Sequence, residues 1–190
     1  TKTRTTVDFS KPLHTTYMQD EIRDYLNGAG FNEMLTYSLQ DWTKGHLTAD
    51  RAVEDLNPVS AEASVLRTSL VPGALTVVQH NRSRGQKNLR MFEIGNVFGL
   101  RDDKPGETLD SFIEEERLLV VLSGSIVSEQ YGSEHRETDF FDLKGEVQAL
   151  LSKFCLDKYR FISYDSASAL IESALAVEIN GTYAGFLGKV

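Results

Sequence analysis

The side chain types that most often carry catalysis are present in this chain but scattered along it. Its four histidines stand singly, and no two are spaced to bind one metal ion from a single helix face: His14, His46, His80 and His135. There is no GxSxG nucleophile elbow, no GxxxxGK[ST] phosphate loop and no GxGxxG turn. Carboxylates cluster at 102–103 and 114–116, in polar surroundings that would not raise a pKa for general acid catalysis. The residues alone therefore predict no catalytic, cofactor-binding or metal site.

A basic cluster is the next candidate for a binding site. It comprises His80, Arg82, Arg84, Lys87 and Arg90, with Gly85 among them. One interpretation is structural, because cations favour the negative C-terminal end of a helix and glycine stops one. The other is a contact with RNA phosphates inside a larger assembly. The net charge of −8 argues against a chain that binds nucleic acid by itself.

The strand expected at 89–98 ends in the apolar run Gly95-Asn96-Val97-Phe98-Gly99. A fold that binds a nucleotide over such a strand needs a cation close to its end, because a guanidinium can hold phosphate oxygens in a bidentate manner. Gly99 has no side chain, and Arg101 lies about 7 Å further along the strand. Arg101 also precedes two aspartates that would compete for it. The residues alone leave two interpretations open, an active site and the shell of one.

Composition indicates an ordinary globular domain with a core of its own. The chain has 190 residues, 41% hydrophobic and 25% charged, with no apolar run long enough to span a bilayer and no signal-peptide pattern. We therefore expect a cytoplasmic location. The single cysteine, Cys155, excludes an internal disulfide and lies in an apolar helical pattern, which predicts a buried structural thiol. The missing initiator methionine and the end at 188–190 suggest a module cut from a longer polypeptide.

Hydrophobic periodicity predicts helices at 16–29, about 71–83 and 142–154. The first carries one apolar stripe and ends at Gly30; the stripe comprises Met18, Ile22, Tyr25, Leu26 and Ala29. Such a stripe must be buried, either against the chain's own sheet or against a partner.

Strands are predicted at 31–39, 89–98, 117–123, 159–164, 175–179 and 182–187, the last two joined by an Asn180-Gly181 hairpin turn. Residues 1–13 are expected to form an entry arm or edge strand, 40–63 a surface excursion and 101–116 a solvated loop. With no regular βαβ alternation, these elements predict an α+β fold with a largely antiparallel sheet flanked by helices.

Several stretches, in order from about residue 14 to 188, resemble the core of the phenylalanyl-tRNA synthetase beta subunit. The longest are LRTSLVPGAL at 66–75 and NRSRGQKNLRMFEIGNVF at 81–98. Shorter ones lie at 22–26, 30–33, 36–38, 57–60 and 140–145. The resemblance implies a class II aminoacyl-tRNA synthetase catalytic-domain-like module over 14–190. It also implies that this module lacks the chemistry and is a fragment of a longer beta chain.

What the family resemblance implies about partners is specific. The module would scaffold the catalytic module of the alpha subunit, in an enzyme with two alpha–beta pairs. That enzyme attaches L-phenylalanine to tRNA(Phe) and uses ATP and Mg²⁺, although this module would bind no cofactor itself. The helix at 16–29 and the strand at 31–39 would correspond to motif 1, which makes the stripe from Met18 to Ala29 a subunit interface. Gly99 would stand where motif 2 has its arginine, and the chain from 166 to 190 contains no arginine for motif 3.

Two alternatives stay open. One is a stand-alone class II-like enzyme that activates a small carboxylate with ATP, with Arg101 or Arg90 taking over the phosphate contact. The other is a regulatory paralogue that kept the synthetase shell to bind an amino acid or RNA, supported by the basic segment at 82–90.

Overall fold

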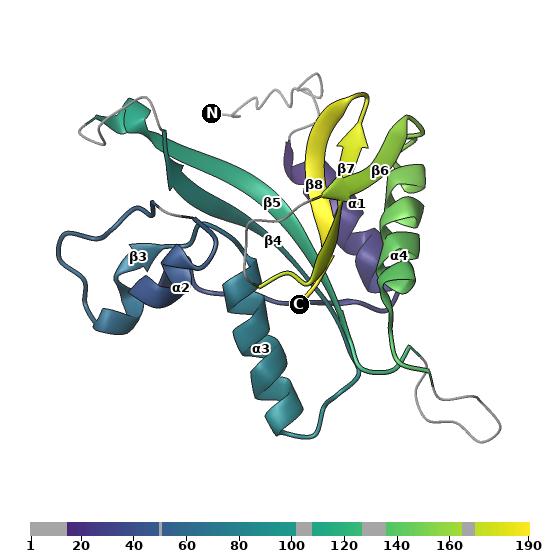
Figure 1. Ribbon diagram of the computed structural model, residues 1–190, viewed down its shortest axis with the longest axis horizontal. Helices are drawn as coiled ribbons and strands as arrows, with labels where there is room; N and C mark the ends of the chain where they lie inside the picture. The colour runs from purple at the N-terminus through teal and green to yellow at the C-terminus, as the bar shows by residue number, and fades with distance from the viewer. Residues whose placement is uncertain (1–14, 50, 102–107, 127–135, 165–169) are drawn as a thin grey trace, which may run out of the picture.

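A long antiparallel hairpin forms the centre of the structure, a computed structural model that describes residues 15–49, 51–101, 108–126, 136–164 and 170–190. The hairpin consists of β4 (Leu89–Leu100) and β5 (Phe112–Ser123), paired without a break from Leu89 opposite Ser123 to Leu100 opposite Phe112. Figure 1 shows its two strands crossing the molecule between the helices. The predicted arm at 1–13 lies outside the described residues.

Helix α1 (Thr15–Gly28) packs on one face of this hairpin. Leu26 and Phe31 are buried together with Phe92 of β4, the first at 1% exposure. Gly30 has a φ of 84°, a left-handed conformation that only glycine adopts freely. This turn ends the helix, as predicted, and drops Phe31 into the core beneath it.

Helix α3 (Val71–Ser83) packs on the opposite face. Its Ala74 is buried with Met34 and with Met91 of β4, so successive residues of β4 serve two different cores. Pro72 stands in the first turn, where its missing N–H has no helical acceptor to lose. The chain reverses at Gly85, which has a φ of 86°.

The predicted strand at 31–39 is largely wrong. Only β1 (Asn32–Glu33) pairs with β4, in parallel, and β2 (Leu39–Gln40) instead pairs antiparallel with β3 (Val65–Leu66). Met34 still donates its N–H to the carbonyl of Phe92 at 2.8 Å. Thr36, however, donates its N–H to a side chain, Oε1 of Glu93, at 3.1 Å. The ladder ends because a carboxylate replaces the backbone acceptor.

The surface excursion predicted at 40–63 contains regular structure. Helix α2 (Trp42–His46) begins at Asp41, whose side chain accepts from the N–H of Lys44, and a 3₁₀ turn, η1, spans Ala61–Ala63. Ala52 is buried. The segment is thus attached to the fold at several points.

The loop predicted at 101–116 is also too long. Residues 102–107 lie outside the described part, but a 3₁₀ turn, η2, spans Leu109–Ser111 and β5 begins at Phe112. The three glutamates at 114–116 are exposed members of this strand. Pairing along the whole length of β4 outweighs their low strand propensity.

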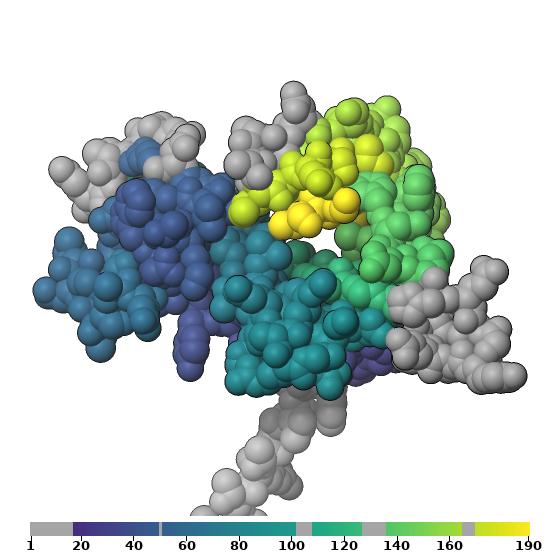
Figure 2. All heavy atoms as spheres, turned by 60° about the horizontal axis from the view of Figure 1, so that its bottom comes forward, coloured from purple at the N-terminus to yellow at the C-terminus, as the bar shows by residue number. Residues whose placement is uncertain are grey.

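A second antiparallel sheet follows, formed by β6 (Tyr159–Tyr164), β7 (Ser173–Ile179) and β8 (Thr182–Lys189) in that order. Helix α4 (Phe140–Lys153) covers it, and the shared core centres on Leu151, Val177 and Leu187. The predicted Asn180-Gly181 turn is confirmed, with both residues at positive φ. Figure 2 shows an opening between the yellow atoms of β8 and the teal atoms of the first sheet.

The thiol of Cys155 is exposed, which contradicts the prediction of a buried structural cysteine. The residue follows the end of α4 and has a φ of 55°, so the chain turns there. The apolar stripe of α4 ends before Cys155, so it does not bury the thiol.

The α+β class with mainly antiparallel sheets is confirmed, the pair β1–β4 being parallel. Across the described ranges, no helix combines the length and the apolar character needed to cross a membrane.

The first turn of α4 makes an acid-sensitive cap. The guanidinium of Arg136, with the backbone N–H of Asp139, lowers the pKa of Asp142 from 3.8 to about 2. Because the pKa is lower in the folded state, the stabilisation is present above 3.8 and is lost as the pH falls through about 2. We predict that Arg136→Gln raises the pKa of Asp142 in a carboxyl NMR titration. Arg160→Gln, which removes a distant exposed ion pair, should leave it unchanged.

Candidate functional site

Two charged side chains in the part of the fold built around β4 and β5 are almost without solvent contact. Arg67, between β3 and α3, is 4% exposed, and Glu93 of β4 is 1% exposed. Their Nη1 and Oε1 atoms are 2.7 Å apart. Burying a charge without a partner is strongly unfavourable, so each side chain needs the other at this place.

Thr36 completes this cluster. Arg67 Nη1 also donates to Thr36 Oγ1 at 2.8 Å, and Arg67 Nε donates to the carbonyl of Asn96 at 2.8 Å. The hydroxyl of Thr36 donates to Glu93 Oε2 at 2.8 Å. The guanidinium is therefore occupied by protein acceptors on two of its nitrogens.

The position of Arg67 is also fixed by the backbone around it. Its N–H donates to the carbonyl of Ser38 and its carbonyl accepts from the N–H of Phe98, both at 2.8 Å. A Cβ at Gly95 would collide with Arg67 Nη2, so the strand must have no side chain there. Arg67 is a structural residue in this fold.

The strand end at Gly99 borders a hollow of about 450 Å³. A Cβ placed on Gly99 would meet no atom within 4 Å, and the backbone there does not require glycine, because its φ is not positive. The space an arginine side chain would enter from this position is thus open. That Gly99 stands in the place of a motif 2 arginine stays a prediction.

Arg101 does not fill that place. It is exposed just beyond the end of β4, its N–H donates to the carbonyl of Ser111, and it is not part of the hollow's lining. Two other guanidinium groups, those of Arg51 and Arg117, do line it. Neither was predicted, because Arg51 lies within the segment expected to be a surface excursion and Arg117 begins an apolar run.

The predicted interface stripe divides between core and surface. Leu26 is buried in the core, and Ile22, Tyr25 and Ala29 pack against that core. Met18 is 59% exposed. Leu26→Asp would therefore disrupt this chain's own packing, so it is unsuitable as an interface test. An interface role stays a prediction for the exposed end of the stripe.

The basic cluster divides as well. Arg82 and Arg84 are exposed at the end of α3, where Arg84 Nη1 contacts His80 Nδ1 at 2.8 Å, and Lys87 is also exposed. Arg90 is separate from them: it bonds to Oε1 of Glu146 in α4 at 2.5 Å and lies over the ring of Phe31. Arg90 is thus engaged within the fold, and a contact with RNA stays a prediction for the cluster.

No cluster of metal-ligating side chains is found within the described ranges. No three side chains of histidine, cysteine, aspartate or glutamate gather there to hold an ion. His46 stacks on Trp42, with ring centroids 4.2 Å apart, and its Nδ1 donates to the carbonyl of the same residue at 2.9 Å. His14 and His135 lie outside the described residues.

We predict that Arg67→Met destabilises the chain by about 3–5 kcal/mol, because it leaves the buried carboxylate of Glu93 without its cation. Chemical denaturation would measure the loss. Adding Glu93→Gln should restore part of it, since the remaining side chain is neutral. A double variant as unstable as the sum of both single variants would show that the pair is not coupled.

Comparison with known proteins gives one consistent family. The family model described as "Phenylalanyl tRNA synthetase beta chain CLM domain" matches residues 1–190. The phenylalanine–tRNA ligase beta subunit of Burkholderia lata is 31% identical over 175 residues, which are 90% of this chain and 21% of that protein. The beta subunit of Salinibacter ruber is 39% identical over 142 residues, 70% of this chain and 17% of that protein. The chain thus spans about a fifth of the length of these relatives.

Solved structures support the same fold. Pyrrolysyl-tRNA synthetase from Desulfitobacterium hafniense superposes with a TM-score of 0.60 at 14% identity, covering 88% of this chain and 56% of that one. At this identity the likeness concerns the fold alone, which is that of a class II synthetase. The match over residues 1–190 shows that the chain belongs to the phenylalanyl-tRNA synthetase beta chain CLM domain family.

Proposed function

We propose that this chain is a non-catalytic scaffold within the beta subunit of phenylalanine–tRNA ligase. The observation that carries the proposal has two parts: the space beside Gly99 is free, and the guanidinium of Arg67 is bound by protein acceptors. Holding the phosphates of a nucleotide needs a cation at the end of β4. The buried arginine in this part of the fold, Arg67, is instead bound to Glu93, Thr36 and Asn96. The walls of a class II site are present in this proposal, and the catalytic site belongs to the alpha subunit.

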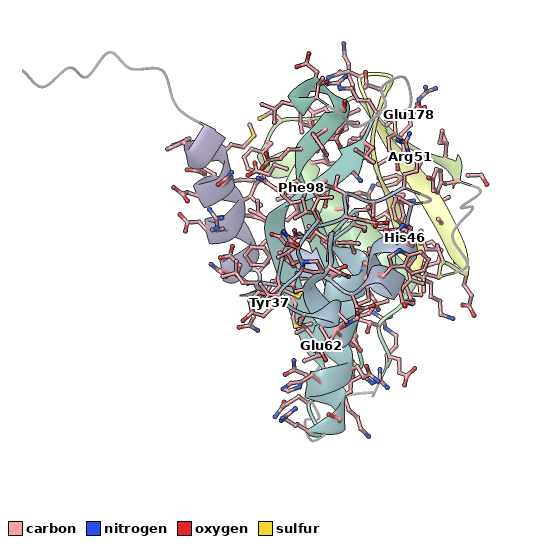
Figure 3. All side chains as sticks on the ribbon, turned by 90° about the vertical axis from the view of Figure 1, so that its left-hand side faces the viewer. Tyr37, His46, Arg51, Glu62, Phe98 and Glu178 are labelled. Atoms are coloured by element: carbon pink, nitrogen blue, oxygen red, sulfur yellow. The ribbon has the colours of Figure 1, made fainter. Side chains whose placement is uncertain are left out.

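The partner in this proposal is the catalytic module of the alpha subunit. Support comes from apolar side chains left in solvent on two adjoining elements: Leu35 and Tyr37 after β1, at 87% and 90% exposure, and Tyr17 and Met18 of α1. Arg23 of α1 and Glu33 of β1 join these elements through a 2.9 Å ion pair. Figure 3 places Tyr37 toward the side of the molecule where α1 lies. Exposed apolar residues of this size mark interaction surfaces.

The whole enzyme in this proposal contains two alpha–beta pairs in the cytoplasm and attaches L-phenylalanine to tRNA(Phe) with ATP and Mg²⁺. This module contributes through its partner and binds neither cofactor. The exposed cations Arg82, Arg84 and Lys87 are available for a phosphate contact with the tRNA.

A stand-alone carboxylate-activating enzyme is less well supported. It required Arg101 or Arg90 at the phosphate site, but Arg101 lies outside the hollow and Arg90 is bound to Glu146. No observation favours the regulatory paralogue over the scaffold.

The proposal predicts no adenylate formation by the beta subunit alone. We expect the full-length beta chain that carries this module to catalyse no phenylalanine-dependent exchange of pyrophosphate into ATP, whereas the complete assembly does. Exchange by the purified beta chain would overturn the scaffold assignment.

The proposal also predicts the position of the subunit contact. Leu35→Asp combined with Tyr37→Asp should weaken association with the alpha subunit, because charge then enters an apolar interface. The fold should be retained, since both side chains are exposed. Phe141→Asp, at an exposed position in the first turn of α4, is the matched control and should assemble normally. Size-exclusion chromatography with the alpha subunit measures the outcome, and normal assembly of the double variant would mean that the contact lies elsewhere.

A further inference from the structure

The hollow beside Gly99 is a built feature whose purpose the scaffold role leaves open. It lies between the segment after α2, which supplies Thr48 and Arg51, and the far half of the β4–β5 hairpin, which supplies Val97, Gly99 and Arg117. Gly95 and Gly99 occupy the same face of β4. The guanidinium of Arg67 covers Gly95, while the surface of Gly99 stays open. The empty volume begins where the buried cluster ends.

The hydroxyl groups in this hollow have no proton left for a ligand. Thr68 Oγ1 donates to the carbonyl of Gly45 at 2.9 Å. Thr48 Oγ1 lies 2.8 Å from Thr68 Oγ1, and because the proton of Thr68 is already used, Thr48 must be the donor of this pair. The side-chain donors that remain along the lining are the two guanidinium groups.

Those two cations differ in how far they are neutralised. Arg117 Nη2 forms a 2.7 Å ion pair with Glu115, which also lines the hollow, and both side chains are half exposed. Arg51 is exposed and makes no ion pair with any residue that the structure describes. Two arginines against one glutamate leave one net positive charge in a chain whose total charge is −8. Figure 3 labels Arg51 together with Phe98 of β4.

We propose that this hollow binds a small oxyanion, a phosphate or a carboxylate, between Arg51 and Arg117. A guanidinium offers paired N–H donors that match the oxygens of either group. The site is distinct from a class II phosphate clamp, because its cations come from the segment after α2 and from β5 and not from the end of β4. The side chains of Val97 and Ile113 leave room for a short apolar body attached to the anion.

Binding at this site must be weak and sensitive to salt. Both guanidinium groups are in contact with solvent, where ionic screening and water compete with the ligand. This inference does not depend on the scaffold role, since an anion bound between Arg51 and Arg117 gives no catalysis of its own.

The first experiment locates the anion in crystals of the full-length protein in its natural assembly. One set is soaked in tungstate, an analogue of phosphate, and the other in 4-bromobenzoate, and anomalous scattering identifies the heavy atom. We expect a peak between Arg51 and Arg117 in at least one set, and the set that gives it names the chemistry. No peak at this place with either probe would overturn the proposal.

The second experiment tests whether the site is specific, by equilibrium dialysis of radiolabelled phosphate, or of labelled benzoate if that probe gave the peak. Arg51→Gln removes the unpaired cation, and Gly99→Leu adds a side chain beside the hollow at a position where a Cβ would meet no atom within 4 Å. Each substitution should weaken binding of the labelled anion at this site on the order of tenfold. Arg160→Gln, which removes an exposed arginine of β6, controls for total charge and should have no effect. Equal losses in all three variants, or none in the first two, would mean that the ion is adventitious.

Discussion

The part of the fold built around β4 and β5 is held in place by the buried ion pair between Arg67 and Glu93. Three stretches far apart in the sequence meet there: the residues after β1, the residues after β3, and the middle of β4. Charges that are 4% and 1% exposed are tolerated only when their partners are held in the correct geometry. The pair therefore fixes the path of the backbone around it, and Thr36 leaves the β1 ladder because its N–H is needed at the carboxylate.

The same interaction separates the shape of the site from its chemistry. A guanidinium that satisfies Glu93, Thr36 and Asn96 cannot also hold a triphosphate, and Gly95 must lack a side chain to accommodate it. Gly99 lies four residues further along the same face of β4, and its backbone conformation does not require glycine. The architecture of a class II site can thus persist because its cohesion comes from a buried pair that takes no part in phosphate binding.

The sequence was sufficient for elements whose pattern is strong and local. The helices at α1, α3 and α4, the strand β4 and the Asn180-Gly181 hairpin follow from apolar periods and from glycine, and the structure confirms them. It was insufficient where distant partners decide. β5 begins in charged residues because β4 extends opposite them. The β1 ladder ends because the carboxylate of Glu93, far away in the sequence, accepts the N–H of Thr36. The one available signal for the buried pair was a charge of each sign inside an otherwise apolar segment, at Arg67 and Glu93.

The stripe on α1 shows why an interface is harder to predict than a core. Periodicity says that one face of a helix is covered, but not by which chain. Here the C-terminal part of the stripe lies over Phe92, since Gly30 turns the chain so that Phe31 packs beneath Leu26. The N-terminal part ends in the exposed Met18. A scaffold needs both properties: a core that is complete within the chain, and apolar residues left over for a partner. Part of this remainder, at Leu35 and Tyr37, lies where no helical period could have revealed it.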